Sequence, residues 1–393
     1  MEGHLYEWAN LLIRWLHITV GIAWIGASFY FNWLENQLER NGPKPEGVAG
    51  TLWAIHGGGF YHLQKYQVAP EQLPTRLHWF KWEAYYTWLT GILLLAVVYY
   101  LNASTNLIDP SVADITPTTA SLIGIGVLVA SWFVYDGLCR SPLGQRPLAL
   151  SLVGFALLVL LAWGLSQLFS GRGAYIHVGA AIGTCMAVNV FRVIIPGQRA
   201  MVEAIKAGTR PDPAKGIAGA QRSRHNNYLT LPVLFIMISN HFPMTYGSQW
   251  SWLVLAGLMA VGIGIRHYFN IRHLQVAKVW LIPVTLVGLV AIIAFTAPRP
   301  LPAPAADAPP VPFEEIAHIM EARCAGCHAA QPTFGGLSTA PKGVRLDTPA
   351  HIRQQRGPIG QVTVHTRTMP PGNLTQMTED ERALLAQWLQ QDD

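Results

Sequence analysis

Two cysteines and a histidine lie in the run Cys324-Ala-Gly-Cys327-His328. This C-x-x-C-H pattern is typical of c-type haem attachment, in which both thiols form thioethers with the porphyrin and the histidine binds the iron. A structural zinc site would need a second Cys/His pair at matching spacing, and a thioredoxin-like redox pair would need a βαβ setting. Neither surrounds the motif, so the sequence predicts one covalently bound haem c.

The second axial ligand of such a haem is expected well downstream, in a loop that faces the iron. Met369 lies in the Pro-rich run TRTMPPG, between the haem motif and the last predicted helix. Its competitors are Met377, next to a predicted helix start, and the histidines His351 and His365. We favour Met369, because a methionine near a helix start is more often a packing residue. Met/His ligation raises the reduction potential, which suits an electron acceptor.

Three histidines, His17, His177 and His241, lie within long apolar stretches of the chain. Ionisable side chains are costly in such segments and are functional candidates by default. Each could be a partner in an interhelical hydrogen bond, or two of them could hold a membrane haem b by bis-imidazole ligation, with a copper site as a weaker alternative. A haem nearer the inner side is also a weaker alternative, with three candidate ligands: His78, His225 and His267.

The segment 34–81, between the first two apolar stretches, is far longer than the usual helix connection, which favours a functional role. It contains LWAIHGGGFYHLQKY and runs into LPTRLHWFKWEAYY. Three consecutive glycines allow the backbone to approach a ligand closely, whereas the Trp, Tyr and Lys residues are also expected in an interfacial belt. From this region we take four candidate catalytic residues, which supply bases, a stacking face and a cation: His56, Tyr61, Lys65 and Glu83.

These residues must be positioned by a chain that is unusually poor in charge. Of its 393 residues, 12% are charged and 51% are hydrophobic, whereas an average soluble protein has about 25% charged residues. Much of the surface must therefore face lipid, and a nucleic-acid binder or a disulfide scaffold is excluded as the main theme. Eight apolar stretches approach the ~20 residues that a helix needs to cross a bilayer: 10–33, 84–101, 118–138, 147–169, 175–195, 226–243, 249–269 and 279–297.

Lys and Arg residues are distributed asymmetrically around these stretches. The loops on one predicted side carry sixteen of them, whereas the loops on the other side carry only Arg172 and Arg299. The positive-inside rule places the basic loops in the cytoplasm. We therefore expect a multi-pass membrane protein whose N- and C-termini both lie outside the cytoplasm.

The end of the chain differs in composition from the rest. The Pro/Ala tract 298–312 cannot hold a helix and is expected to act as a semi-rigid linker. Residues 313–393 are predicted to form a small helical domain, whose last helix begins with a capping box of Thr378 and Glu381. The predicted fold class is all-α: an eight-span transmembrane helical bundle in residues 1–297, followed by a small class I-like cytochrome c domain in residues 313–393.

Three runs in the membrane part and one in the tail together carry a resemblance. The runs are RWLHITVGIAWIGASFYFNWLE, IHGGGFYHLQKY and LHWFKWEAYYTWLTG, followed by a C-terminal CAGCH domain that ends with MPPGNLTQMTEDER. In this order the chain resembles the membrane-bound, cytochrome c-fused urate oxidase (urate hydroxylase) family of bacteria. The resemblance covers essentially the whole chain, and the combination of runs is more specific than the haem motif alone.

The resemblance implies oxidation of urate to 5-hydroxyisourate, with electrons passed to cytochrome c and not to dioxygen. It also implies a location in the bacterial inner membrane, with periplasmic termini. The expected partners are urate, inner-membrane lipid and a downstream cytochrome c or terminal oxidase, without nucleic acid. It fixes no urate-binding residue. Two other classes stay open from the residues: a quinol:cytochrome c oxidoreductase, and a haem or copper transporter with a cytochrome c tail.

Overall fold

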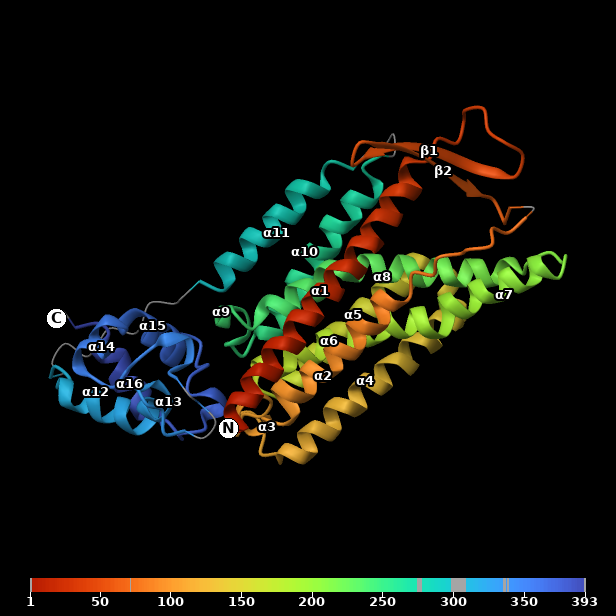
Figure 1. Ribbon diagram of the computed structural model, residues 1–393. Helices are drawn as coiled ribbons and strands as arrows, with labels where there is room; N and C mark the ends of the chain where they lie inside the picture. The colour runs from red at the N-terminus through yellow and green to blue at the C-terminus, as the bar shows by residue number, and fades with distance from the viewer. Residues whose placement is uncertain are drawn as a thin grey trace.

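Two helical bodies make up the structure, a computed structural model that describes residues 2–70, 72–273, 278–297, 309–334, 337 and 339–391 (Figure 1). The larger body is a bundle that extends to residue 297. Its main helices are α1 (Glu2–Gln37), α2 (Trp82–Leu95), α4 (Pro117–Arg140), α5 (Pro147–Ser166), α6 (Gly171–Asn189), α8 (Pro213–Ser239), α10 (Ser251–Ile271) and α11 (Leu281–Phe295). Each of the eight predicted apolar stretches falls on one of these helices.

Shorter elements extend or connect the main helices. The π-helical turn η1 (Ala96–Tyr100) continues α2, and η3 (Val190–Ile194) joins α6 to α7 (Ile195–Lys206). The connections contain α3 (Ala103–Asn106), the 3₁₀ turn η2 (Pro142–Gln145) and α9 (Pro243–Tyr246). Such π-turns occur often at functional sites, and η1 directs Tyr99 and Tyr100 toward the centre of the bundle, where both rings contact His177.

The surface of the bundle is that of a protein with several membrane helices. Within the described residues, five helical segments are long and apolar enough to cross a bilayer: 4–37, 117–140, 147–166, 171–206 and 251–271. Ile22, Phe133 and Leu148 are 68%, 68% and 73% exposed, as expected where side chains face lipid rather than water. The helices α2, α8 and α11 are not among the five, so eight crossings stay a prediction.

Helix α6 lies at the centre of the bundle, packed against α4, α5 and α8. Most of its residues are buried, because glycine and alanine on its surface let neighbouring helices approach closely. A Cβ atom on Gly179 would lie 2.5 Å from a side-chain carbon of Ile236 on α8. Tyr175 is almost fully buried, and its hydroxyl oxygen lies 2.6 Å from the carbonyl oxygens of both Thr245 and Ser251, either of which can accept its proton. These contacts hold the outer end of α6 against α9 and α10.

The protein is mostly helical, as predicted, but the long segment after α1 contains a β-hairpin. Strands β1 (Val48–His56) and β2 (Gly59–Tyr66) pair antiparallel, with His56 opposite Gly59. Gly57 and Gly58, which form the turn, have φ values of 58° and 80°. A two-residue hairpin turn of this hand requires positive φ at both positions. The glycine run is therefore explained by the turn itself, and no ligand is needed to account for it.

The smaller body, called here the C-terminal domain, comprises residues 309–391. It contains α12 (Phe313–Met320), η4 (Glu321–Ala325), α13 (Gly326–His328), η5 (Pro341–Gly343), α14 (Pro349–Gln354), α15 (Arg356–Gly360), η6 (Gln361–His365), η7 (Pro371–Asn373) and α16 (Glu379–Trp388). Its own core gathers Ile316, Met320, Leu385 and Trp388. The capping box of Thr378 and Glu381 at the start of α16 is confirmed. Residues 298–308 of the predicted linker lie outside the described residues.

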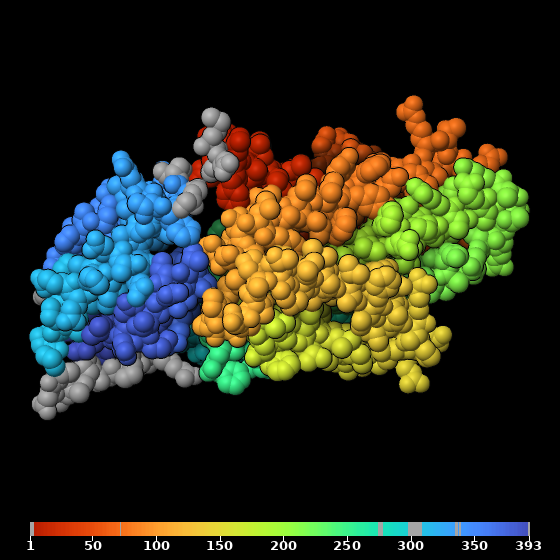
Figure 2. Space-filling view, turned by 90° about the horizontal axis from the view of Figure 1, so that it is seen from below, coloured from red at the N-terminus to blue at the C-terminus, as the bar shows by residue number. Residues whose placement is uncertain are grey.

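The C-terminal domain lies against the end of the bundle at which α1 begins, whereas the β-hairpin and α7 lie at the opposite end (Figures 1 and 2). The contact is close. A Cβ atom on Gly247, which follows α9, would lie 2.5 Å from Cβ of Thr366, and one on Gly372 would lie 2.6 Å from the carbonyl oxygen of Ile108. The start of α1 and the C-terminal domain therefore share one end of the bundle, and the side of the membrane on which that end lies stays a prediction.

Candidate functional site

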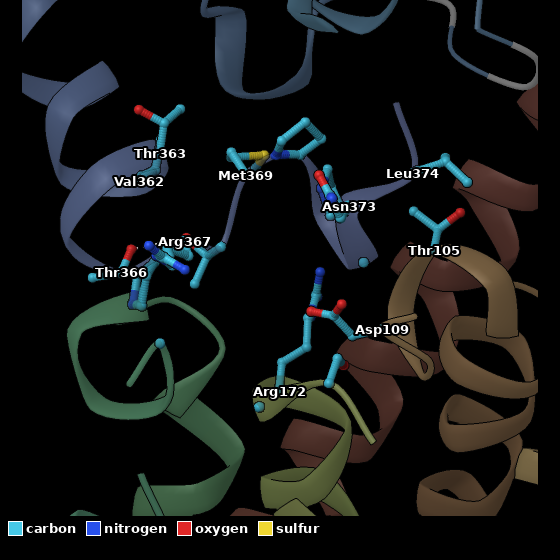
Figure 3. A pocket seen from close by; sticks show the side chains of 18 of the residues that line it. Thr105, Asp109, Arg172, Val362, Thr363, Thr366, Arg367, Met369, Asn373 and Leu374 are labelled. Carbon is cyan, nitrogen blue, oxygen red and sulfur yellow. Dashed lines mark hydrogen bonds between the residues drawn. The ribbon is translucent and has the colours of Figure 1, made fainter. Parts of the chain in front are cut away.

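A cavity of about 1120 Å³ lies between the bundle and the C-terminal domain. Both bodies line it: Cys324, Cys327, His328 and Met369 from the C-terminal domain, and Arg172 among others from the bundle. Figure 3 shows Arg172 and Asp109 rising from the bundle toward the loop that carries Met369. The haem motif and the loop that the sequence paired with it therefore face the same space.

The haem motif occupies two short consecutive helical turns. Cys324 lies in the π-turn η4, and Cys327 and His328 lie on α13. Nδ1 of His328 lies 2.9 Å from the carbonyl oxygen of Val344. This hydrogen bond fixes the ring and leaves Nε2 available for a metal, as is usual for metal-binding histidines. Both cysteines are unpaired, and burial raises the pKa of the Cys324 thiol to about 12.

A network of hydrogen bonds near the surface holds the chain after the motif in place. Asp347 accepts hydrogen bonds from the guanidinium of Arg345 at 3.0 Å and from the backbone N–H of Ala330 at 2.8 Å, and Nδ1 of His351 lies 2.9 Å away. These contacts, led by the one with Arg345, hold the pKa of the Asp347 carboxyl well below its usual range. His351 is thereby engaged away from the cavity.

The two candidate methionines have different surroundings. Met369 lines the cavity, and its loop is held by the backbone, since its N–H donates to the carbonyl of Val362 at 3.0 Å and its carbonyl accepts from Arg382 at 3.1 Å. Met377 is only 3% exposed and packs in the core of the C-terminal domain. Two thiols, one oriented imidazole and one thioether thus line one cavity, and this donor set fits a covalently attached haem with His/Met ligation.

The wall contributed by the bundle is polar. It includes Arg172 at the start of α6, Asn106 at the end of α3, and Asn240 and Tyr246 after α8. Nη1 of Arg172 donates to the side-chain oxygen of Asn106 at 3.2 Å. The hydroxyl of Tyr99 donates to the side-chain oxygen of Asn240 at 3.0 Å. The cavity is therefore bounded by haem-type ligands on one side and by a cation and two amides on the other.

The comparison with protein families identifies the larger body. The family described as urate oxidase N-terminal matches residues 3–297. The chain belongs to this family. Membership indicates an oxidoreductase that acts on urate. No curated protein and no solved structure matches the chain in the corresponding comparisons.

The matched region of the urate oxidase N-terminal family includes the three membrane histidines, which contact different partners. Nδ1 of His17 lies 3.1 Å from the carbonyl of Thr87 and 3.0 Å from the hydroxyl of Thr90 on α2. His177 is fully buried and has both ring nitrogens engaged, by the carbonyl of Gly173 at 2.8 Å and the hydroxyl of Tyr100 at 3.1 Å. His241 is exposed just beyond α8.

His17 and His177 are therefore engaged in hydrogen bonds within the bundle. Bis-imidazole ligation needs one free nitrogen on each of two facing rings, which His177 does not offer while Tyr100 binds it. Among the described residues, no group of three His, Cys, Asp or Glu side chains could hold a metal ion. His177 therefore does not fit haem ligation as it stands, and the membrane haem stays a prediction from the sequence.

The histidines proposed for an inner haem are also engaged or exposed. Nδ1 of His225 lies 2.8 Å from the hydroxyl of Tyr135, and Nδ1 of His267 lies 2.7 Å from that of Tyr228. His78 is exposed and packs edge-on against Phe80. No contact in the described part of the chain links these three rings to one another.

The four candidate catalytic residues of the segment 34–83 are divided between two elements. His56, Tyr61 and Lys65 lie on the hairpin, whereas Glu83 lies in the first turn of α2. His56 and Tyr61 are exposed, and Lys65 forms an ion pair with Glu35 of α1. One carboxylate oxygen of Glu83 is buried without a hydrogen-bond partner among the described residues. None of the four lines the cavity, and none contacts another.

Sequence reasoning missed the polar wall of the cavity. From the sequence, Arg172 counts only as one of the cations in the loops between the apolar stretches, and neither Asn106 nor Asn240 belongs to a motif. The available signal was that Arg172 is one of only two Lys or Arg residues in the loops of the less basic side. The role of Arg172 depends on three elements, α3, α6 and α8. They lie far apart in the sequence and meet at one place in the fold.

Proposed function

We propose that this protein is a membrane-bound oxidoreductase that oxidises urate to 5-hydroxyisourate and passes the electrons through a haem c, rather than directly to dioxygen. The observation that carries the proposal is the shared cavity, lined on one side by Cys324, Cys327, His328 and Met369 and on the other by the urate oxidase N-terminal region. An electron-accepting group and the substrate-oxidising region then meet without an intervening partner.

The reaction balances without dioxygen. A water molecule adds to C5 of the urate monoanion, and formation of 5-hydroxyisourate releases one proton and two electrons. Cys324 and Cys327 would hold a haem covalently, and His328 and Met369 would supply its iron ligands. The haem supplies a one-electron acceptor of raised potential. Each turnover therefore needs two transfers, and a downstream cytochrome c or terminal oxidase must remove both electrons.

The proposed setting is the bacterial inner membrane, with both termini and the C-terminal domain on the periplasmic side. The apolar helices support a membrane protein. The asymmetry of Lys and Arg between the two sides supports the orientation. A haem on the periplasmic side is well placed to pass electrons to a cytochrome c.

The first prediction concerns the substrate. Purified full-length protein, oxidised and free of oxygen, is mixed with urate, and the visible spectrum is followed. We expect the bands of reduced haem c to appear, with two haems reduced per urate consumed. In air, the electrons should leave by the haem, so hydrogen peroxide should not accumulate in proportion to urate. Pyridine haemochrome analysis of the same sample counts haem c and any haem b.

A double variant, Cys324→Ser with Cys327→Ser, is the control, because it should lose the covalent haem and with it the spectral response. Rapid reduction by a quinol with no response to urate would instead identify a quinol:cytochrome c oxidoreductase. No reduction by either donor would favour the transporter with a cytochrome tail.

A further inference from the structure

One arginine in the cavity stands apart from the others. Four arginines line it, and three form ion pairs: Arg323 with Glu381 at 3.0 Å, and Arg367 and Arg382 with Glu379 at 2.7 and 4.0 Å. The fourth, Arg172, has no carboxylate within 4 Å among the described residues. A guanidinium in a partly enclosed cavity is a strong attractant for a planar anion, because its N–H groups can donate in parallel.

The position of Arg172 is well defined. It lies in the first turn of α6, where the helix dipole adds positive potential. One nitrogen, Nη1, is held by Asn106, and the guanidinium lies 5.9 Å from the centre of the Tyr99 ring. Its Nε is buried and has no hydrogen-bond partner among the described residues. A buried donor without a partner is costly and calls for an explanation beyond packing.

The neighbouring groups suit the edge of an oxidised purine, which alternates N–H and C=O groups. Asn240 presents an amide whose oxygen is bound by Tyr99, so the orientation of the amide is fixed. The ring of Tyr246 lines the same wall. The cavity also contains the carboxylate of Asp109, whose Oδ1 accepts from the backbone N–H and the hydroxyl of Ser111, at 3.0 and 2.6 Å.

We propose that Arg172, together with Asn240, binds the urate anion at the floor of the cavity, on the same side of the bundle as the haem motif. This inference rests on the proposed function and adds the binding site to it. Substrate and haem motif then share one cavity, so electrons need not cross the ~30 Å of hydrocarbon from the opposite end. The hairpin offers a poorer site, because its cation Lys65 is already paired with Glu35.

The test separates binding from turnover. A purine anion that cannot be oxidised, 8-azaxanthine, is equilibrated by dialysis with detergent-solubilised holoprotein, and bound ligand is measured. Arg172→Gln should weaken binding about 10- to 100-fold, the range expected when a charge-assisted hydrogen bond is lost. Arg172→Lys keeps the charge but loses the parallel N–H donors. Its affinity for 8-azaxanthine should lie between those of the wild type and Arg172→Gln. The dithionite-reduced spectrum of each variant shows whether the haem domain is intact.

A matched control is Arg146→Gln, which removes an exposed arginine at the opposite end of the bundle and should bind as the wild type does. If Arg172→Gln does not fold, Asn240→Asp replaces it: the carboxylate still accepts from Tyr99 but repels an anion, so binding should again fall. Unchanged binding in Arg172→Gln or Asn240→Asp overturns the inference, as does loss of binding in Lys65→Ala alone. Failure of urate to reduce the wild-type haem would instead refute the proposed function, whatever the dialysis gives.

Discussion

At the scale of single residues, the environment of a side chain separates candidates that the sequence could only rank. Met369 and Met377 lie eight residues apart and are chemically identical, yet one lines the cavity and the other is buried in the core of the C-terminal domain. The same distinction applies to cations. Lys65 has a carboxylate partner, whereas Arg172 has none in the part of the chain that the structure describes, so the residue that looked like a topology marker is the better site for an anion.

The methionines give a direct prediction. Met369→Ala should remove the weak red charge-transfer band that methionine ligation gives ferric haem and should lower the reduction potential, with little change in unfolding free energy. Met377→Ala should keep the band but destabilise the C-terminal domain by about 2–5 kcal/mol, because it leaves a cavity in the core. Optical spectra, redox titration and denaturant unfolding measure these effects. Loss of the band in Met377→Ala with retention in Met369→Ala would reverse the assignment.

At the scale of elements, the segment 34–81 shows how a local pattern can be interpreted in two ways. Consecutive glycines suit close approach to a ligand, and they also suit a tight hairpin turn. The flanking residues alternate in a way that permits β pairing, which the structure shows for Val48–His56 and Gly59–Tyr66. The turn by itself explains the glycines. The better-supported candidate site is therefore the cavity at the opposite end of the bundle.

The β-hairpin can be tested at its turn. Gly57→Val should destabilise the pairing of β1 and β2 by about 1–2 kcal/mol, because a residue with a Cβ atom is strained at positive φ. Hydrogen exchange of the β2 amides should therefore become faster, by about tenfold. Gly59→Ala is the matched control, since the added Cβ atom would make ordinary contact with the Tyr61 ring at 3.6 Å. Complete loss of urate-driven haem reduction in Gly57→Val would return the substrate site to the hairpin.

At the scale of the whole molecule, the cavity exists only because two separately folded bodies meet. The C-terminal domain has its own core, and the bundle supplies Arg172, Asn106 and Asn240 from elements that the chain connects at long range. The contact at Gly247 is close enough that no side chain fits there. The seating of the domain on the bundle is therefore a structural requirement of the proposed electron path.

The seating can be tested at that glycine. Gly247→Val should push the C-terminal domain away from the bundle, because the new side chain would meet Thr366. The backbone at Gly247 has a φ of −84°, so valine adds no conformational strain of its own. We expect slower haem reduction by urate with an unchanged dithionite-reduced spectrum. Gly357→Ala, with nothing within 4 Å of the added atom, should behave as the wild type. Equal rates in both variants would show that the seating is not needed.

The sequence by itself determined the parts whose signal is local or additive along the chain. Apolar stretches predicted the helices of the bundle, Thr378 and Glu381 predicted the capping box, and the membrane part was assigned to the family that matches it. The C-x-x-C-H spacing predicted a haem site, and this site remains a proposal. In each case, residues close together in the chain, or a composition summed over about twenty residues, carry the information.

Tertiary structure alone decided which of these parts face one another. Whether His177 is free to bind a metal depends on Tyr100, 77 positions away, and whether Arg172 is paired depends on every carboxylate that the fold brings near it. Burial and partnership are properties of the packed chain, because they are set by contacts between helices that are distant in sequence. The polar floor of the cavity could therefore not be predicted from any single run of residues.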